Sequence, residues 1–238
     1  MGWRDAFWLD GESAGAAGLR LQEPIRFSAP RPRYETAEIP GRSGLLQRFE
    51  GVFDNVTGTA RCFALERGRV ETALAAVNRW CFAAFGYRRL ETEDEPEIYR
   101  LAVVTSGAET ELRMRTLAPF TLTFDCKPQR YLKSGERAAA LTASGARLAN
   151  PGMESRPLIT VYGAGAGTLT AGGRTVQLKS LDGWLTLDCD LQNAYKGTQN
   201  KNNTIFAPEF PVLPPGESAV TWTGGVTRVE IIPRWWVL

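Results

Sequence analysis

The sequence predicts a mainly β protein with a single prominent helix. Apolar and polar residues alternate with period two over many short stretches, turn-forming residues separate these stretches, and one segment alone carries apolar residues at helical spacing. Many short strands with regular turns are typical of a β-sandwich or a β-barrel. The 238 residues, 43% of them hydrophobic, allow one large β-domain or two of ordinary size, with a core that needs neither disulfides nor metals.

The clearest strand runs over 120–126. Phe120, Leu122, Phe124 and Cys126 share one face, and polar residues lie between them. Because side chains alternate between the two faces of a strand, this pattern predicts a half-buried strand. The same alternation predicts strands over 167–170, 175–178, 185–189, 220–222 and 228–232. Turn signals stand at Gly172-Gly173, Asp182-Gly183, Pro214-Pro215-Gly216 and Gly224-Gly225.

The spacing predicts one helix over 69–84. Val70, Leu74, Val77 and Cys81 recur on one side of it, and Gly86 follows as a C-terminal stop. A helix with one apolar stripe must bury that stripe, so we expect it to lie against a sheet of the first half of the chain.

The character of the sequence changes after Pro128, where a proline and a polar patch interrupt the alternation. We therefore predict an N-terminal β-domain over 1–128, which contains the helix, and a C-terminal β-domain over 129–238. The polar segment 192–203 is expected to be an exposed loop.

Composition excludes several classes of function. The 28 basic residues nearly balance the 26 acidic ones without a basic block, so nothing indicates nucleic-acid binding. Histidine is absent, which removes Ser-His-Asp and Cys-His nucleophiles and His-ligated zinc. The four cysteines form no CxxC pair and are expected to be buried, reduced thiols. There is neither a signal-peptide pattern nor an apolar run long enough to span a membrane.

Three motifs are candidate sites. The glycine-rich run 163–167 lacks the Lys-Ser/Thr of a phosphate-binding loop, and we predict a hairpin turn there. Asp188 and Asp190 lie two apart on a predicted strand, which suits a divalent cation or acid–base chemistry, although a solvated strand face is favoured. The acidic run 91–95 is expected to form a solvent-facing turn between two strands.

Aromatic residues offer a further candidate site. Tyr162, Trp184, Tyr195 and Trp222 could form a platform for sugar rings, but nothing in their spacing shows that they converge.

The apolar end of the chain, 231–238, must be buried in its own domain or against another subunit, and burial in its own domain is favoured. Trp235 and Trp236 face opposite ways in an extended chain, so one of them can reach an interface.

The second half of the sequence resembles the distal tail proteins of siphophages, especially those of phages that infect Gram-positive bacteria. The matching segments are Asn150–Gly152, Ser155–Gly163, Gly167–Thr170, Leu187–Tyr195, Asn202-Asn203, Phe210–Gly216 and Ile231–Trp236. In the first half, the loop Ile39–Gly44, the helix ending near Trp80 and the strand 120–126 are similar in position but less specific.

The resemblance implies a function and a set of partners. The N-terminal β-domain would form a hexameric ring, and the C-terminal domain would be a galectin-like or jelly-roll β-sandwich. The ring would be a structural hub at the distal end of the phage tail, assembled in the host cytoplasm from a phage or prophage gene. It would join the tail tube protein to a tail-associated lysin, a tail fibre hub and receptor-binding proteins. The family implies no catalytic residue, cofactor or metal, and this short chain has no inserted carbohydrate-binding module.

Two alternatives remain beside the hub. A β-sandwich with exposed aromatics is also typical of a carbohydrate-binding module, here one that recognises host cell-wall polysaccharide. A β-rich hydrolase would use carboxylates such as Asp188 and Asp190.

Overall fold

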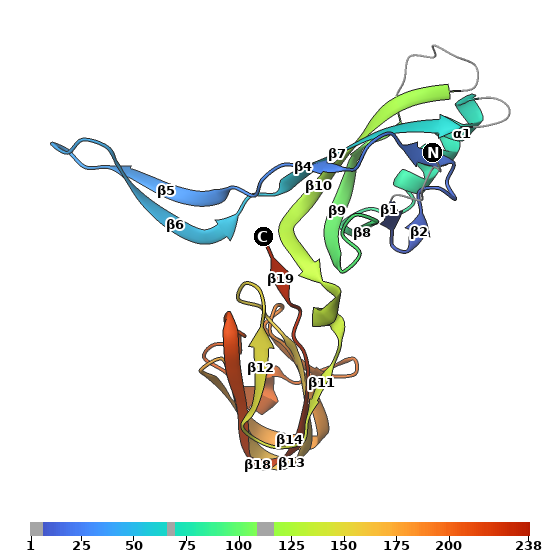
Figure 1. Cartoon of the computed structure of the whole chain (residues 1–238). Helices are drawn as coiled ribbons and strands as arrows, with labels where there is room; N and C mark the ends of the chain where they lie inside the picture. The colour runs from blue at the N-terminus through green and yellow to red at the C-terminus, as the bar shows by residue number, and fades with distance from the viewer. Residues whose placement is uncertain (1–6, 66–69, 109–116) are drawn as a thin grey trace. The chain divides into compact units, whose positions relative to one another are not determined.

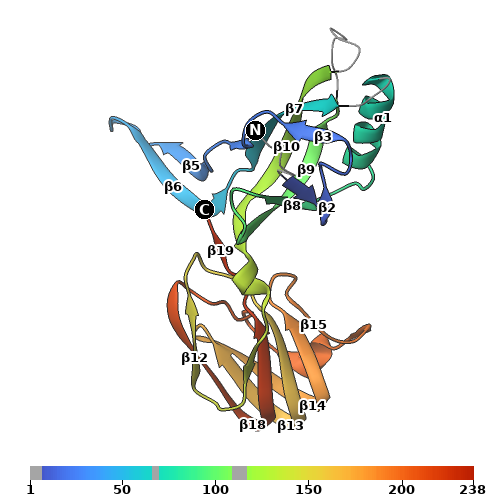
Figure 2. The same cartoon turned by 45° about the vertical axis from the view of Figure 1, so that its right-hand side comes forward.

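The computed structural model describes residues 7–65, 70–108 and 117–238. The protein is mainly β, as the sequence predicted, and one α-helix lies among the described residues. The chain forms two compact units, which are residues 1–130 with Leu238 (unit 1) and residues 131–237 (unit 2). Figures 1 and 2 show both units.

Unit 1 is built on an antiparallel sheet in the order β2-β1-β8-β9-β10-β7-β3, with β4 also paired to β7. Its strands are β1 (Phe7–Leu9), β2 (Glu12–Ser13), β3 (Leu19–Leu21), β4 (Arg26–Phe27), β7 (Val56–Leu65), β8 (Arg88–Thr92), β9 (Ile98–Ser106) and β10 (Leu117–Leu132). The predicted strand 120–126 lies inside β10, which continues through Pro128. Its residues Phe120, Leu122, Phe124 and Cys126 are buried, so the predicted core face is confirmed.

The helix α1 (Val70–Cys81) lies against this sheet. Ala73, Val77, Trp80 and Cys81 belong to the same buried cluster as the apolar face of β10, which confirms the predicted packing. The ring of Trp80 packs 5.7 Å from that of Phe7.

The predicted helix end at Ala84 is wrong, because α1 ends at Cys81. The Arg88 guanidinium donates to the carbonyl oxygens of Trp80 and Cys81, which satisfies acceptors that a further turn would otherwise use. Gly86 lies in the following loop and is not the cap. Residue 69, the predicted start, lies outside the described residues.

Between β4 and β7 the chain forms a separate two-stranded sheet, β5 (Pro32–Glu38) and β6 (Leu45–Phe53). We call residues 32–53 the arm. In both Figures 1 and 2 it projects as a blue ribbon from the rest of unit 1. Every residue from 32 to 52 is exposed, so the arm contributes almost nothing to the core of its own unit.

Unit 2 is a second antiparallel sheet in the order β11-β18-β13-β14-β15-β16, with β12 also paired to β18 and β17 to β14. Its strands are β11 (Ala139–Leu141), β12 (Ala146–Asn150), β13 (Leu158–Ala171), β14 (Arg174–Asp188), β15 (Asn193–Lys196), β16 (Gln199–Asn200), β17 (Ile205–Phe206) and β18 (Gly216–Ile232). The short strand β19 (Trp236–Val237) is not part of this sheet and pairs with β10. Two short 3₁₀ turns are η1 (Lys133–Glu136) and η2 (Asn202–Thr204).

The five short strands predicted in the second half join into three long ones, β13, β14 and β18. Each bends where the register shifts, between Gly165 and Gly167 and around Gly163. On β18 the buried positions change from even to odd across the bend. A bulge of this kind keeps the apolar side chains on the inside of a bent strand. The sheet therefore curls around one core.

Three predicted turns are wrong, because 163–167, Asp182-Gly183 and Gly224-Gly225 lie within strands. Glycine is needed there for close approach of two backbones. A Cβ on Gly225 would lie 1.6 Å from the Ala164 carbonyl oxygen, and one on Gly163 would lie 2.0 Å from that of Gly225. Gly172-Gly173 does form the predicted turn, between β13 and β14.

The polar segment 192–203 was predicted as a loop and instead contains the β15–β16 hairpin. Asn202 closes it, since its side-chain oxygen accepts from the Ala194 amide and its side-chain nitrogen donates to Asn193. These local side-chain bonds order a segment whose composition is that of a loop.

The glycine contact gives a first prediction. Gly225→Ala should lower the free energy of unfolding by about 3 kcal/mol or more, because the methyl group has no room between β13 and β18. Gly165→Ala is the matched control, since this glycine has a φ of 84° but open space around its Cβ position. It should cost only the backbone strain, about 1 kcal/mol. Urea unfolding measures both, and equal losses would contradict the steric explanation.

Candidate functional site

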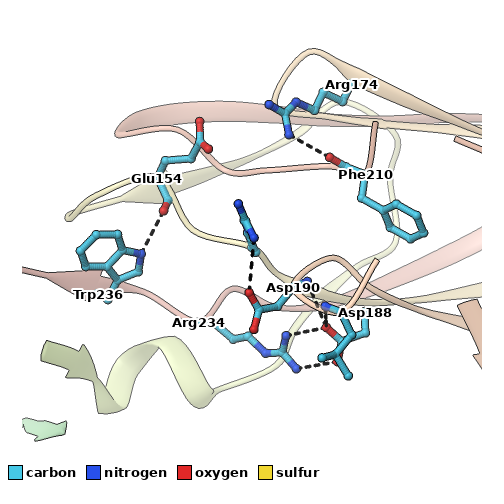
Figure 3. Close-up of polar contacts among 9 residues, drawn as sticks. Glu154, Arg174, Asp188, Asp190, Phe210, Arg234 and Trp236 are labelled. Atoms are coloured by element: carbon cyan, nitrogen blue, oxygen red, sulfur yellow. Dashed lines mark hydrogen bonds and ion pairs between the residues drawn. The ribbon is translucent and has the colours of Figure 1, made fainter. Parts of the chain in front are cut away.

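The C-terminal segment is held within unit 2. The Leu132 amide donates to the carbonyl oxygen of Trp235, the Arg234 amide to that of Gly135, and the Met153 amide to that of Trp236. Trp235 is buried in the core of the unit. Trp236 is half-exposed and its Nε1 donates to the Glu154 carbonyl oxygen (Figure 3). Of the two tryptophans predicted as interface residues, only Trp236 thus has a side chain that is partly accessible to solvent. Its role at an interface stays a prediction.

Asp188 and Arg234 form the ion pair that fixes this segment. The two guanidinium nitrogens of Arg234 lie 2.8 and 3.0 Å from the carboxylate oxygens, and Figure 3 shows the two groups pointing at each other. The amides of Asp190 and Leu191 also donate to Asp188. Burial alone would raise the pKa of Asp188, but these hydrogen bonds and the charge of Arg234 outweigh it and lower the pKa.

The prediction that Asp188 and Asp190 share a solvated face is therefore wrong. Asp188 is buried in its ion pair, and Asp190 lies beyond the end of β14, exposed, with its carboxylate 3.8 Å from Arg156. The two carboxylates have different surroundings and different partners. The lowered pKa of Asp188 keeps its carboxylate charged, which is the opposite of what a general acid needs.

The structure brings together three of the four aromatic residues proposed as a sugar platform. Tyr162 on β13 lies directly opposite Trp184 on β14, and Tyr195 on β15 lies opposite Thr186, two residues further along β14. All three are half-exposed and alternate with buried residues of the core. Trp222 was wrongly included, because it is 9% exposed and packs in the core of unit 2.

Charged side chains complete this surface. The Tyr162 hydroxyl donates to Glu230 at 2.8 Å, and the guanidinium of Arg228 lies 4.2 Å from the centre of the Tyr162 ring. Arg228 and Glu230 are paired at 3.1 Å. We call Tyr162, Trp184, Tyr195, Arg228 and Glu230 the aromatic face. A shallow hollow at this end of β14 is lined by Leu181, Leu185, Lys196 and Lys201 beside Trp184. Lys196 follows Tyr195 on β15 and so faces the same way as the buried Leu185, which places the hollow toward the inner side of the sheet.

The arm of unit 1 is a second candidate surface. The register places Tyr34 opposite Phe49 and Glu38 opposite Leu45 on one side of the ribbon, and Glu35 opposite Arg48 on the other. The ring of Phe49 lies 5.8 Å from that of Tyr34 and 5.5 Å from that of Phe53. The side with Tyr34, Leu45 and Phe49 also carries Glu38, and the other side carries Ala37 and Leu46 beside Glu35 and Arg48. We call the side that holds the aromatic pair the apolar side.

This apolar side faces solvent in the single chain. Tyr34, Leu45 and Phe49 are 47%, 54% and 46% exposed. A two-stranded hairpin is at best marginally stable alone in water, and exposed apolar patches mark protein interfaces. Sequence reasoning missed this surface, because 34–38 (YETAE) and 45–49 (LLQRF) lack the regular alternation that marks a strand with one apolar side.

Comparison with known proteins agrees with this fold. No protein-family model matches the sequence, and no curated protein does either. Among solved structures, the chain is similar to the crystal structure of the SPP1 Dit protein (gp 19.1), described as a paradigm of the hub adsorption apparatus in phages that infect Gram-positive bacteria. The similarity covers 95% of this chain and 97% of that one, with a TM-score of 0.74 and 15% identity.

The chain has the Dit fold. The resemblance of its sequence to distal tail proteins is thereby confirmed at the level of the fold.

Within this Dit fold the cysteines carry no reactive thiolate. Cys62, Cys81, Cys126 and Cys189 are free and buried, as predicted. Burial raises the pKa of Cys81 to about 11 and of the other three to about 12. In the described part of the chain, His, Cys, Asp and Glu form no group of three or more that could hold a metal ion. The helix described here is not long and apolar enough to cross a membrane.

The buried ion pair gives a second prediction. Asp188→Asn should lower the free energy of unfolding by about 2 kcal/mol near neutral pH, because Arg234 loses a charged, bidentate partner. Since the pKa of Asp188 is lowered in the folded state, its contribution is present above the ordinary aspartate pKa and disappears as the pH falls through the lower, folded value. The variant should therefore lose less stability than the wild type between about pH 6 and about pH 3.

Urea unfolding across this pH range measures the effect. Asp190→Asn is the control, since the exposed Asp190 should change stability by no more than about 0.5 kcal/mol. A wild type and an Asp188→Asn variant with parallel pH profiles would show that the pair does not hold the C-terminal segment.

Proposed function

We propose that this chain is a structural virion protein, a distal tail protein that assembles as a hexameric hub at the tip of a phage tail. The hub connects the tail tube to the adsorption apparatus. The exposed apolar side of the arm is the observation that carries the proposal. The Dit fold over nearly the whole chain supports it, since the SPP1 protein of that fold is described as a hub.

The arm suits a ring because rings need a head-to-tail contact. Such an interface joins one surface of a subunit to a different surface of the next, and it closes when the rotation between copies divides a full turn. An extended hairpin with one apolar side supplies the first surface. When a neighbouring copy covers Tyr34, Leu45 and Phe49, the arm gains the burial that its own unit does not provide.

The two parts of the chain then take different roles. The N-terminal part, 1–128, carries the arm and forms the ring, and the C-terminal part, 129–238, presents its sheet outward. The partners are the tail tube protein on one side and a tail-associated lysin, fibre hub or receptor-binding protein on the other. The hub acts by assembly and not by catalysis, which agrees with the ion-paired state of Asp188 and with the protonated thiols.

The third prediction tests the ring. The wild type should form hexamers in size-exclusion chromatography with light scattering, and rings in negative-stain electron microscopy. Phe49→Glu should give monomers with an unchanged unfolding transition of unit 2, because it places a charge on the apolar side of the arm, which plays no part in the core.

Phe206→Glu is the matched control. Phe206 is an exposed aromatic residue of similar accessibility, 52% against 46% for Phe49, but it lies in unit 2. It should leave the hexamer intact. A wild type that stays monomeric at micromolar concentration and shows no rings, or a Phe49→Glu variant that still forms hexamers, would overturn the proposed role of the arm.

A further inference from the structure

We propose that the aromatic face of unit 2 is a binding site for an uncharged saccharide, with the ring of Trp184 as the stacking surface. The proposal rests on the geometry of the β13–β14–β18 sheet and stands independently of hexamer assembly.

The first argument is the placement of the side chains in rows across neighbouring strands. Arg228, Tyr162 and Trp184 occupy consecutive positions on β18, β13 and β14. One step along the strands, Glu230, Thr160 and Thr186 form the next row, and Tyr195 extends it onto β15. Aromatic rings thus lie beside hydrogen-bonding groups on one surface. A sugar ring offers the matching chemistry, since it has an apolar C–H face and a rim of hydroxyl groups.

The second argument is the exposure of Trp184. Trp184 is half-exposed, whereas Leu185 and Leu187 are buried on the other side of β14. Trp184 lies directly opposite Tyr162 in the register, so both side chains are on the outer side of the sheet. Aromatic rings there can supply contact area, while the neighbouring polar groups fix the orientation of a small polar ligand.

The charges and the rigidity of this surface indicate that its ligand is uncharged. Arg228 is paired with Glu230, so the two charges of the aromatic face compensate each other. An anionic polymer would need an uncompensated basic patch, and a neutral saccharide does not. The paired groups are also held in place before the ligand arrives, because the opposite side of the same strands is the buried core. A site that is already ordered loses less entropy on binding.

Cross-strand aromatic neighbours also stabilise a sheet without binding anything. The experiment must therefore separate ligand binding from stability. The full-length protein is applied to an array of neutral oligosaccharides built from hexoses and N-acetylhexosamines. The strongest binder is then titrated calorimetrically against the wild type and three variants.

Trp184→Ala should weaken binding about tenfold or more, since the stacking surface is lost. Tyr162→Phe keeps the ring but removes the bond to Glu230, and it should cause a smaller loss. Phe206→Ala removes an exposed aromatic residue elsewhere on unit 2 and should bind like the wild type. Thermal unfolding of each variant shows whether a loss of binding comes from a loss of fold.

Two results would overturn the proposal. One is a wild type that binds no sugar on the array, and the other is a Trp184→Ala variant that is folded and binds as the wild type does. Light scattering on the same samples separates this outcome from the hub. Intact hexamers without sugar binding reject the saccharide site alone, and sugar binding by a monomer rejects the ring alone.

Discussion

The close contact between the β13 and β18 backbones is the constraint on which unit 2 depends. At this point a carbonyl oxygen of one strand lies where a Cβ of the other would have to be, and glycines at 163 and 225 remove that conflict. The bulges beside them change which residues face inward, so both halves of the long strands line one core. The same bend determines that Tyr162 and Trp184 face outward together.

Unit 1 differs from unit 2, because apolar side chains of its arm remain exposed to solvent in the single chain. Its core is complete around Phe7, Phe124 and α1, with the two rings 5.8 Å apart in an edge-to-face contact. The arm, however, buries no apolar surface against this core. Hydrophobic burial is the main favourable term in folding and in most association, so in the proposed hub a neighbouring copy would stabilise the arm. Assembly and folding of the arm would then be a single process.

The parts of the fold that the sequence predicts are those with local signals. The strand of Phe120 to Cys126 and the packing of α1 follow from spacing alone, because burial repeats with the period of each structure. Two of the failures involve a partner that lies outside the predicted element. The helix ends early because Arg88, well beyond it, takes its last carbonyl oxygens. Asp188 looked solvated because its partner, Arg234, comes 46 residues later.

The candidate surfaces likewise depend on strand register, which has no local signal in the sequence. Glycine marks both turns and close backbone contacts, and only the register distinguishes the two at 163–167. The pairing of Tyr162 with Trp184 also depends on that register, so their spacing in the sequence does not reveal that they converge. Trp222 has a similar local context but lies on the inner side of the sheet, where the bulge on β18 places it.

The two proposals are linked by multivalency. A shallow sheet surface with a few hydrogen bonds and one stacking ring binds a small ligand weakly, because it buries little of that ligand. A ring repeats each surface of its subunit around one axis, and a polymer with repeating sugars can contact several copies at once. Each contact after the first is then intramolecular, and the combined affinity can exceed the single one by a factor of about a hundred or more. Arms that hold the ring together would thus also make a weak saccharide site effective, and each single site would remain free to dissociate quickly.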